Sequence, residues 1–267
     1  MEDYLERRIP LGKTDLMAGP LGVGASYGVP AAAVAEAFER GCNLMYWGAL
    51  RGAPMARAIR EIIHAGRRDE LIIVLQAMLR SGKGVEWSLI RGLRRLGIDY
   101  ADVLLLGWYN HAPRKRLMDQ VEPLRRRGLF RCLALSGHHR PLFPELARDS
   151  RFDLFWVRHN AANRGGERDL FPNLPRPRPG IVAFNATRRM SLVRSRRNTT
   201  DGRKPTPGDC YRFVLTNPSI DVVVTAPRTA RQMRDNLDVV SRGPMNEPEL
   251  DWMRRVGDDV YGDSRRF

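Results

Sequence analysis

This chain is organised around one stretch, Gly41-Cys42-Asn43-Leu44-Met45-Tyr46-Trp47-Gly48-Ala49-Leu50-Arg51-Gly52. Residues 43–46 predict a short buried strand, and a glycine-containing loop follows it. Residues 54–64 then carry the apolar spacing of a helix. A strand that leads through a loop into a helix is the repeating unit of α/β proteins. The stretch therefore predicts that the same unit recurs on either side of it.

The strand-then-helix unit does recur along the sequence. The predicted strands are residues 21–25, 43–46, 71–76, 102–106, 131–136, 152–157, 181–184 and 220–225. The helices predicted to follow them are residues 30–40, 54–64, 85–96, 114–127, 142–149, 167–170, 209–216 and 229–240. One long polar loop, residues 188–207, separates the seventh strand from its helix. A loop of that length in a compact domain is usually functional or mobile.

These strands are apolar rather than alternating, which is typical of a parallel sheet covered on both faces. Eight such units in 267 residues predict an α/β fold, a (β/α)8 TIM barrel. Residues 8–17 predict an N-terminal hairpin cap, and residues 247–260 predict an extra C-terminal helix. We expect residues 1–267 to form a single barrel domain. An open doubly wound sheet is disfavoured, because no Gly-x-Gly-x-x-Gly turn leads the first strand into a helix.

The strongly basic composition raises the question of a nucleic-acid partner. The net charge is +15 and the pI is about 10.7. However, the excess is spread along the chain, mostly as arginine on the predicted helices, and no zinc-finger, RRM or KH motif accompanies it. We therefore expect a solvated arginine-rich surface rather than a nucleic-acid-binding function.

The sequence also bears on compartment and metal content. No run of about 18 apolar residues predicts a transmembrane helix. Residues 1–8 are charged and lack the apolar core of a signal peptide. The three cysteines, Cys42, Cys132 and Cys210, lie far apart and indicate free thiols in a reducing compartment. No cysteine and histidine spacing suggests a metal site. We expect a cytoplasmic protein without a bound metal.

The frame of the organising stretch resembles the signature of the aldo-keto reductase family, Gly-x-Asn-x-x-Asp-Thr-Ala-x-x-Tyr-Gly. Further segments resemble that family in the correct order along the chain: residues 88–103, residues 127–136 and residues 217–236. The resemblance rests on the order and spacing of these segments along the chain. The resemblance implies the same barrel fold and a nicotinamide-dependent oxidoreductase.

The resemblance also identifies the positions of the family's catalytic residues. A tyrosine donates a proton to the carbonyl oxygen, a lysine and an aspartate lower its pKa, and a histidine orients the substrate. At the matching positions this chain has Tyr46 for the aspartate, Arg51 for the tyrosine, Gln76 for the lysine and Gly107 for the histidine. Arginine is not deprotonated in proteins, glutamine is uncharged and glycine has no side chain. We therefore expect a degenerate active site without conventional carbonyl reduction.

The family's cofactor contacts are partly kept. The resemblance implies Ser136, Phe184, Gln232 and Asn236 as contacts for NADP. The contacts to the nicotinamide carboxamide are altered, because the family's Ser-Asn pair is Ser136-Gly137 here and its glutamine is Trp156. NADP is accordingly the expected cofactor, held through these remaining contacts.

Other polar side chains follow the predicted strands, where barrel active sites form. Tyr46, His138 and His159 are the candidate catalytic residues. A small ligand is expected at the mouth, anionic and with an aromatic or apolar body, because arginine pairs well with carboxylate or phosphate. Two further arginines, Arg188 and Arg189, lie near the same strand ends. The candidate ligand-binding residues are Arg51, Trp108, Trp156 and Arg158.

Three functions remain open at the level of sequence. The first is a divergent NADP-linked oxidoreductase in which Tyr46 or a histidine donates the proton. The second is a catalytically inactive barrel, or pseudoenzyme, that binds a ligand or a partner protein. The third is non-redox chemistry of the lyase, isomerase or cyclase type with a histidine base. The sequence alone does not decide whether the protein is an enzyme.

Overall fold

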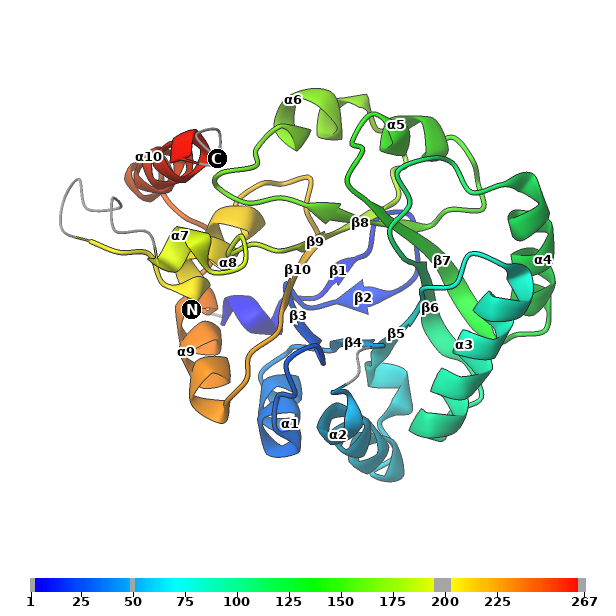
Figure 1. Cartoon of the computed structure of the whole chain (residues 1–267). Coiled ribbons are helices and arrows are strands. Elements are labelled where there is room, and N and C mark those ends of the chain that lie inside the picture. Colours follow the sequence, from blue (N-terminus) through cyan, green and yellow to red (C-terminus); the bar gives the residue numbers. More distant parts are fainter. Residues whose placement is uncertain (1–2, 49–50, 195–202, 264–267) are drawn as a thin grey trace.

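The computed structural model describes residues 3–48, 51–194 and 203–263. Within this part of the chain, eight strands close into a barrel in the order β10-β3-β4-β5-β6-β7-β8-β9 (Figure 1). All neighbouring strands of the barrel pair in parallel, which confirms the (β/α)8 prediction. The strands are β3 (Leu21–Gly24), β4 (Leu44–Trp47), β5 (Ile72–Ala77), β6 (Ala101–Leu106), β7 (Phe130–Gly137), β8 (Leu154–Arg158), β9 (Gly180–Phe184) and β10 (Val222–Thr225).

Helices surround the barrel on its outer side (Figure 1). They are α1 (Ala31–Glu39), α2 (Ala53–His64), α3 (Gly82–Leu96), α4 (Lys115–Arg126), α5 (Leu142–Leu146), α6 (Gly166–Asp169), α7 (Ser191–Arg194), α8 (Pro207–Leu215), α9 (Ala230–Val240) and α10 (Glu247–Asp263). Three short 3-10 helices complete the described elements: η1 (Tyr4–Glu6), η2 (Arg68–Glu70) and η3 (Phe171–Asn173). No helix in the described ranges is long and apolar enough to cross a membrane.

The elements outside the barrel agree with the sequence in two places and differ in one. The antiparallel pair β1 (Ile9–Pro10) and β2 (Met17–Ala18) forms the expected hairpin, and α10 is the expected final helix. The segment 188–207 was expected to be a loop, but its first part forms α7. Residues 195–202 of that segment lie outside the described part of the chain, as do residues 49–50 of the organising stretch.

Alternation along each strand divides the core into two layers, because successive side chains point to opposite faces. On β4, Leu44 and Tyr46 pack in the cluster that fills the barrel. Met45, between them, packs in the cluster that lies between the barrel and the helices. This parity determines which side chains reach the interior at the C-terminal ends of the strands.

Polar side chains at the N-terminal ends of alternate strands form hydrogen bonds and ion pairs that connect neighbouring elements of the barrel. Before β4, Asn43 accepts a hydrogen bond from the Gly19 amide and donates to the carbonyl oxygens of Met17 and Glu70, so it connects the hairpin to the N-terminal end of the barrel.

Aspartates take the corresponding place at three other strands. Asp221, before β10, accepts a hydrogen bond from the Ile181 amide on β9. Comparable carboxylates lie on β6 and before β8, at Asp102 and Asp153, and each of the three aspartates pairs with an arginine.

Candidate functional site

The C-terminal ends of the strands bring several of the predicted site residues together. Tyr46, Trp156 and Phe184 have the parity of the barrel interior and pack in its cluster. Their strands are β4, β8 and β9. β4 and β8 are on opposite walls of the closed barrel, yet the rings of Tyr46 and Trp156 meet across it with centroids 6.5 Å apart. The interior is therefore closed by aromatic side chains just below the mouth.

Tyr46 and Gln76 form the central polar contact of this layer. The Tyr46 hydroxyl donates a hydrogen bond to Oε1 of Gln76 on the neighbouring strand β5. Burial raises the pKa of Tyr46 to about 12. The hydroxyl is thus a poor proton donor at neutral pH, since an effective general acid has a pKa near the working pH.

Glycine at position 107 is required by the same contact. A Cβ atom added to Gly107 would lie under 3.0 Å from Nε2 of Gln76 and from Sδ of Met78, which is closer than real Cβ atoms come. The Gln76 amide therefore occupies the space into which a side chain at position 107 would extend.

A second glycine closes the wall at β7. A Cβ atom at Gly137 would overlap the carbonyl oxygen of Tyr109, under 3.0 Å away. The backbone is held there by two bonds to Ser136: the Trp108 amide donates to its hydroxyl (3.0 Å) and the Tyr109 amide to its carbonyl oxygen (2.7 Å). Sequence reasoning missed the part played by Tyr109, although Gly137 was a signal that backbone approaches closely.

Trp108 is turned away from the interior. Its backbone is in the left-handed region, with φ of 60°, and its side chain is 60% exposed. Its carbonyl oxygen accepts a hydrogen bond from Arg80. The expected pocket wall at Trp108 is therefore an exposed side chain on the β6–α4 loop, and Trp156 supplies the buried wall.

Cations gather beside this aromatic layer. Arg158 ends β8 and is partly buried, and among the residues that the structure describes its side chain makes no hydrogen bond or ion pair. Burial, followed by the charges of Arg140 and Arg188, lowers the pKa of Arg158 from its usual value. Arg140 is held by Asp169 through two hydrogen bonds of 2.7 and 2.8 Å. Arg158 is thus an unpaired charge in a positive environment.

The segment after β9 presents the other arginines in a strained conformation. Arg188, Arg189 and Met190 have φ values of 49°, 53° and 70°. Such left-handed residues cost on the order of 1–3 kcal/mol each unless they are glycine. The Asn185 side chain accepts a hydrogen bond from the Arg189 amide, and Arg188 donates to the Val260 carbonyl of α10. The strain is held in place by these contacts.

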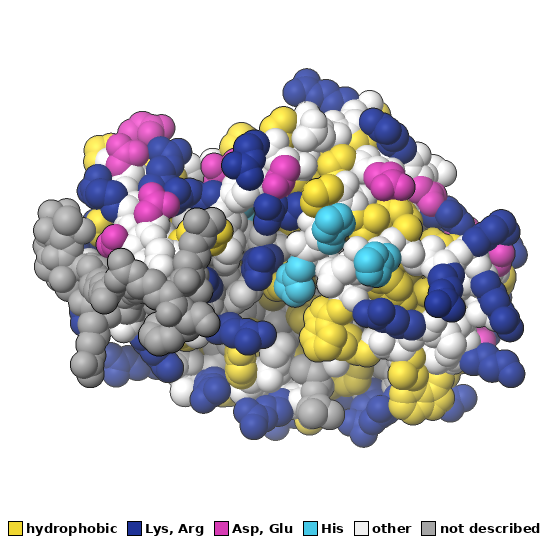
Figure 2. Space-filling view, turned by 45° about the horizontal axis from the view of Figure 1, so that its top comes forward, with side chains coloured by type: hydrophobic (Ala, Val, Ile, Leu, Met, Phe, Trp, Pro, Cys, Tyr) yellow, Lys and Arg dark blue, Asp and Glu magenta, His cyan; other side chains and the backbone are white. Residues whose placement is uncertain are grey.

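His138 belongs to this mouth and His159 does not. The His138 ring lies against Phe184, with centroids 5.8 Å apart. Burial, then the charges of Arg158 and Arg189, lower the pKa of His138. His138 also borders a pocket of about 610 Å³ together with His111 and His139. Figure 2 shows histidines gathered on one face beside lysine and arginine side chains.

His159 directly follows Arg158, so its side chain points to the opposite face of the strand and packs toward the helices. His159 is 1% exposed, stacks on Phe213 of α8 and meets Phe171 edge-on. Its Nε2 atom is 3.4 Å from Oε1 of Glu167, and this close contact with the imidazole lowers the pKa of Glu167. His159 therefore braces the helix layer and does not face the mouth.

Arg51 lies on the wall opposite Arg158, since it follows β4 and Arg158 ends β8. It is exposed and lies beside Gly28 in the loop between β3 and α1. The structure does not bring the two guanidinium groups into contact. A ligand would have to span the mouth to reach both.

No family model matches the sequence, and no curated protein matches it. Solved structures do match. An aldo-keto reductase from Bacillus halodurans in its holo form superimposes with a TM-score of 0.76, at 18% identity over 94% of this chain and 96% of that chain. Its apo form gives 0.75, at 19% identity over 94% and 95%.

A thermostable aldo-keto reductase, Tm1743, solved with the inhibitor epalrestat, gives a TM-score of 0.74 at 22% identity over 94% of this chain and 99% of that chain. This chain has the aldo-keto reductase fold. The resemblance stated from the sequence motifs is confirmed at the level of the fold. These identities do not carry an activity or a ligand to this chain.

Within that fold, Ser136 and Gly137, the residues expected near a nicotinamide, are both in close contact with the backbone of residues 108–109. At Gly137, which the motif resemblance aligns with the family's asparagine, the Tyr109 carbonyl leaves no room for a side chain. The Ser136 hydroxyl is bonded by the Trp108 amide. These two positions therefore do not present the free serine and asparagine side chains expected to hold a nicotinamide carboxamide.

The two predicted contacts on α9 differ from each other. Asn236 is buried, and its amide donates to the Thr225 hydroxyl, which in turn bonds the Tyr211 hydroxyl. Gln232 is exposed and accepts a hydrogen bond from the Arg228 amide. Gln232 is therefore accessible to a ligand, whereas Asn236 serves a buried network between α9, β10 and α8.

Proposed function

We propose that the barrel mouth binds a small anionic ligand with an aromatic or apolar body, and that the protein is not a conventional carbonyl reductase. The observation that carries this proposal is the partly buried guanidinium of Arg158, which has no partner among the described residues. Burial of an unpaired charge is unfavourable, and an anion that pairs with it offsets that cost. The neighbouring cations strengthen the preference for an anion.

The surroundings of Arg158 define the ligand further. A guanidinium matches a carboxylate or phosphate through two parallel hydrogen bonds, and the pair is stronger where water is partly excluded. Trp156 and Phe184 offer apolar surface on the same side, and the Tyr46 ring faces Trp156. We expect the charged group to lie against Arg158 and the apolar body to lie over these rings.

Non-redox chemistry is a second candidate, favoured by His138. Its lowered pKa keeps the imidazole neutral at neutral pH, and a neutral imidazole accepts protons. It lies next to Arg158 at the mouth. A substrate held by its anionic group would therefore place an acidic C–H bond within reach of a base, as in lyase or isomerase reactions.

Conventional reduction is disfavoured by the Tyr46–Gln76 contact. The phenol with a pKa of about 12 has a neutral amide as its partner, so no cation lowers that pKa.

NADP binding through Gln232 is a separate proposal. It is tested by titrating the protein with NADPH and with NADH while tryptophan fluorescence is followed, with Gln232→Ala as the variant.

The binding proposal is tested by calorimetric titration with benzoate, phenyl phosphate and benzenesulfonate, with benzyl alcohol as the uncharged analogue. Arg158→Ala should weaken binding of the three anions about tenfold or more, the usual scale for losing a charged hydrogen-bond partner. Arg126→Ala, on the exposed side of α4, is the matched control and should leave affinity unchanged. If both variants change affinity only through the same shallow salt dependence, the arginines act as diffuse surface charge and the proposal fails.

A further inference from the structure

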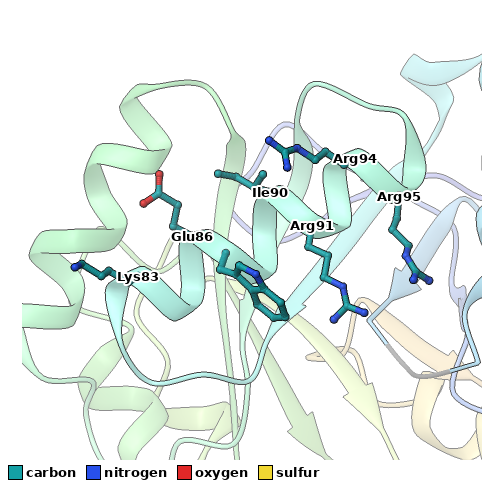
Figure 3. Close-up of a pocket in the computed structure, with 7 residues that line it drawn as sticks. Lys83, Glu86, Ile90, Arg91, Arg94 and Arg95 are labelled. Atoms are coloured by element: carbon teal, nitrogen blue, oxygen red, sulfur yellow. The ribbon is translucent and has the colours of Figure 1, made fainter.

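A second hollow lies on the outer face of α3. Four cations, one carboxylate, one tryptophan and one isoleucine line it, with a volume of about 570 Å³. The helix buries Val85, Leu89, Leu93 and Leu96 against the barrel. Its outward side chains fall in two rows at four-residue spacing: Lys83, Trp87, Arg91 and Arg95 in one row, and Glu86, Ile90 and Arg94 in the other. Figure 3 shows Ile90 and Arg94 on one side of the helix and Arg91 and Arg95 on the other.

The apolar part of this face is large and held in place. Trp87 is 57% exposed, and the guanidinium of Arg91 lies over its ring, 5.2 Å from the centroid. Leu79, 48% exposed, packs beside Gly84 in the first turn of the same helix. An exposed tryptophan fixed by a neighbouring side chain loses little conformational entropy when it is covered, which favours binding.

The charge of the face is positive and unmatched. Lys83, Arg94 and Arg95 have side chains without an ion pair among the residues that the structure describes. The carboxylate, Glu86, is already paired with Arg127 of the adjoining segment at 2.5 Å. Arg60 of α2 bonds the Arg95 carbonyl oxygen and adds another cation at the edge. The face therefore offers donors and positive charge but no free acceptor.

We propose that this face of α3 docks a partner protein through a segment in which an apolar side chain lies between aspartate or glutamate residues. The apolar side chain covers Trp87 and Ile90, and the carboxylates pair with Arg91, Arg94 and Arg95. Tryptophan and arginine are enriched in protein interfaces and dominate their binding energy, whereas lysine is depleted. A second copy of this chain is a poor occupant, because each copy carries a net charge of +15.

The surface proposal does not depend on the ligand at the mouth. The full-length protein carrying Ile90→p-benzoylphenylalanine is cross-linked by light in cells of its own organism, and the products are identified by mass spectrometry. Arg126→p-benzoylphenylalanine is the matched control on α4. We expect position 90, and not position 126, to cross-link reproducibly to a protein at a peptide rich in aspartate or glutamate.

The cross-linked peptide is then synthesised with a fluorescent label, and its affinity for purified protein is measured by anisotropy. Trp87→Ala and Arg91→Glu should each weaken binding about tenfold or more, while Arg126→Glu changes it less than twofold. Circular dichroism of each variant shows whether it is folded, and Trp87→Phe should retain most of the affinity. The proposal would be overturned if cross-linking were equal at the two positions, or if it occurred only to nucleic acid or lipid. It would also be overturned if the affinity of the peptide were unchanged by Trp87→Ala and Arg91→Glu.

Discussion

The Tyr46 hydroxyl donates a hydrogen bond to the side-chain carbonyl oxygen of Gln76, across the adjacent strands β4 and β5. Both groups are neutral, and the motif resemblance aligns their positions with an aspartate and a lysine of the aldo-keto reductases. An ion pair that loses one member leaves a buried, uncompensated charge, which is strongly destabilising. Replacement of both members keeps the contact and removes the charge. Tyr46 and Gln76 therefore satisfy each other's hydrogen-bonding groups without burying a charge.

The first prediction concerns this contact. Tyr46→Phe removes the donor and Gln76→Leu removes the acceptor, and each should lower the free energy of unfolding by about 1–2 kcal/mol. The double variant should lose less than the sum, because the second change removes a group that is already without its partner. Urea unfolding of the four proteins measures the coupling. Tyr27→Phe, whose exposed ring faces Arg228, is the control and should change stability by less than about 0.5 kcal/mol. Strict additivity would contradict the hydrogen bond.

The second prediction concerns Gly107. Gly107→His should destabilise the protein by about 1–3 kcal/mol or more, because its Cβ atom overlaps the Gln76 amide. Gln76→Ala should relieve part of that cost in the double variant, since it removes the overlapping atoms. Thermal unfolding of the single and double variants measures the effect. Equal stability of Gly107→His and the unaltered protein would show that the amide does not fill this space.

The third prediction concerns conventional activity. The purified protein should oxidise NADPH negligibly when supplied with a panel of simple aldehydes. Loss of a general acid alone costs a factor of about 10² to 10⁴ in rate. The loss of NADPH absorbance measures turnover, and a mock purification sets the background. Robust turnover that Tyr46→Phe abolishes would identify Tyr46 as an acid after all and would favour the oxidoreductase hypothesis.

Much of the fold could be predicted because the barrel repeats one local pattern. A short apolar segment followed by a helical one leaves little choice of architecture once it recurs eight times, as the segment around Asn43 illustrates. Less predictable was α7, whose residues follow a run of left-handed backbone at Arg188, Arg189 and Met190. Left-handed φ is normally a glycine signal, so nothing in those residue types indicated the turn.

The candidate site was predictable where the alternation of side chains along a strand determines which of them point into the barrel. The inward positions of Tyr46 and Trp156 follow from alternation along their strands. The same alternation sends His159 to the helix layer, which a position counted from the strand end alone does not reveal. The exposure of Trp108 depends on a loop held by hydrogen bonds to Ser136. Contacts between residues so far apart in the chain cannot be predicted from the local sequence.

The fourth prediction concerns the base of the barrel. Asp221 is buried, accepts two hydrogen bonds from Arg178 at 2.8 and 2.6 Å and one from the Ile181 amide. Asp221→Ala leaves these donors unpaired and should cost about 3–5 kcal/mol. Asp238→Ala breaks an exposed pair with Arg40 and should cost at most about 1 kcal/mol. Denaturant unfolding measures both, and a similar small loss for the two variants would show that the buried network contributes little.

The last prediction concerns the pH dependence of ligand binding at the mouth. In the free protein, burial and the charges of Arg158 and Arg189 hold the pKa of His138 below its usual 6.5, so its imidazole is neutral at neutral pH. A bound anion stabilises the imidazolium and raises that pKa. Protonation of His138 must by linkage raise the affinity for the anion: the gain begins as the pH falls through the pKa of the anion-bound protein and is complete below the lowered pKa of the free protein.

Benzenesulfonate is the suitable probe, since its charge is constant between about pH 5 and pH 8, where an unperturbed histidine titrates. Its affinity for the unaltered protein should rise severalfold over the acidic half of that range, and each unit of pKa difference between free and bound protein corresponds to about a tenfold change. His138→Asn should flatten the profile, whereas the exposed His64→Asn on α2 should not. His111 and His139 border the same pocket as His138. If His138→Asn left the pH profile unchanged while His111→Asn or His139→Asn flattened it, the titrating group would be one of these neighbours, which would contradict the assignment to His138.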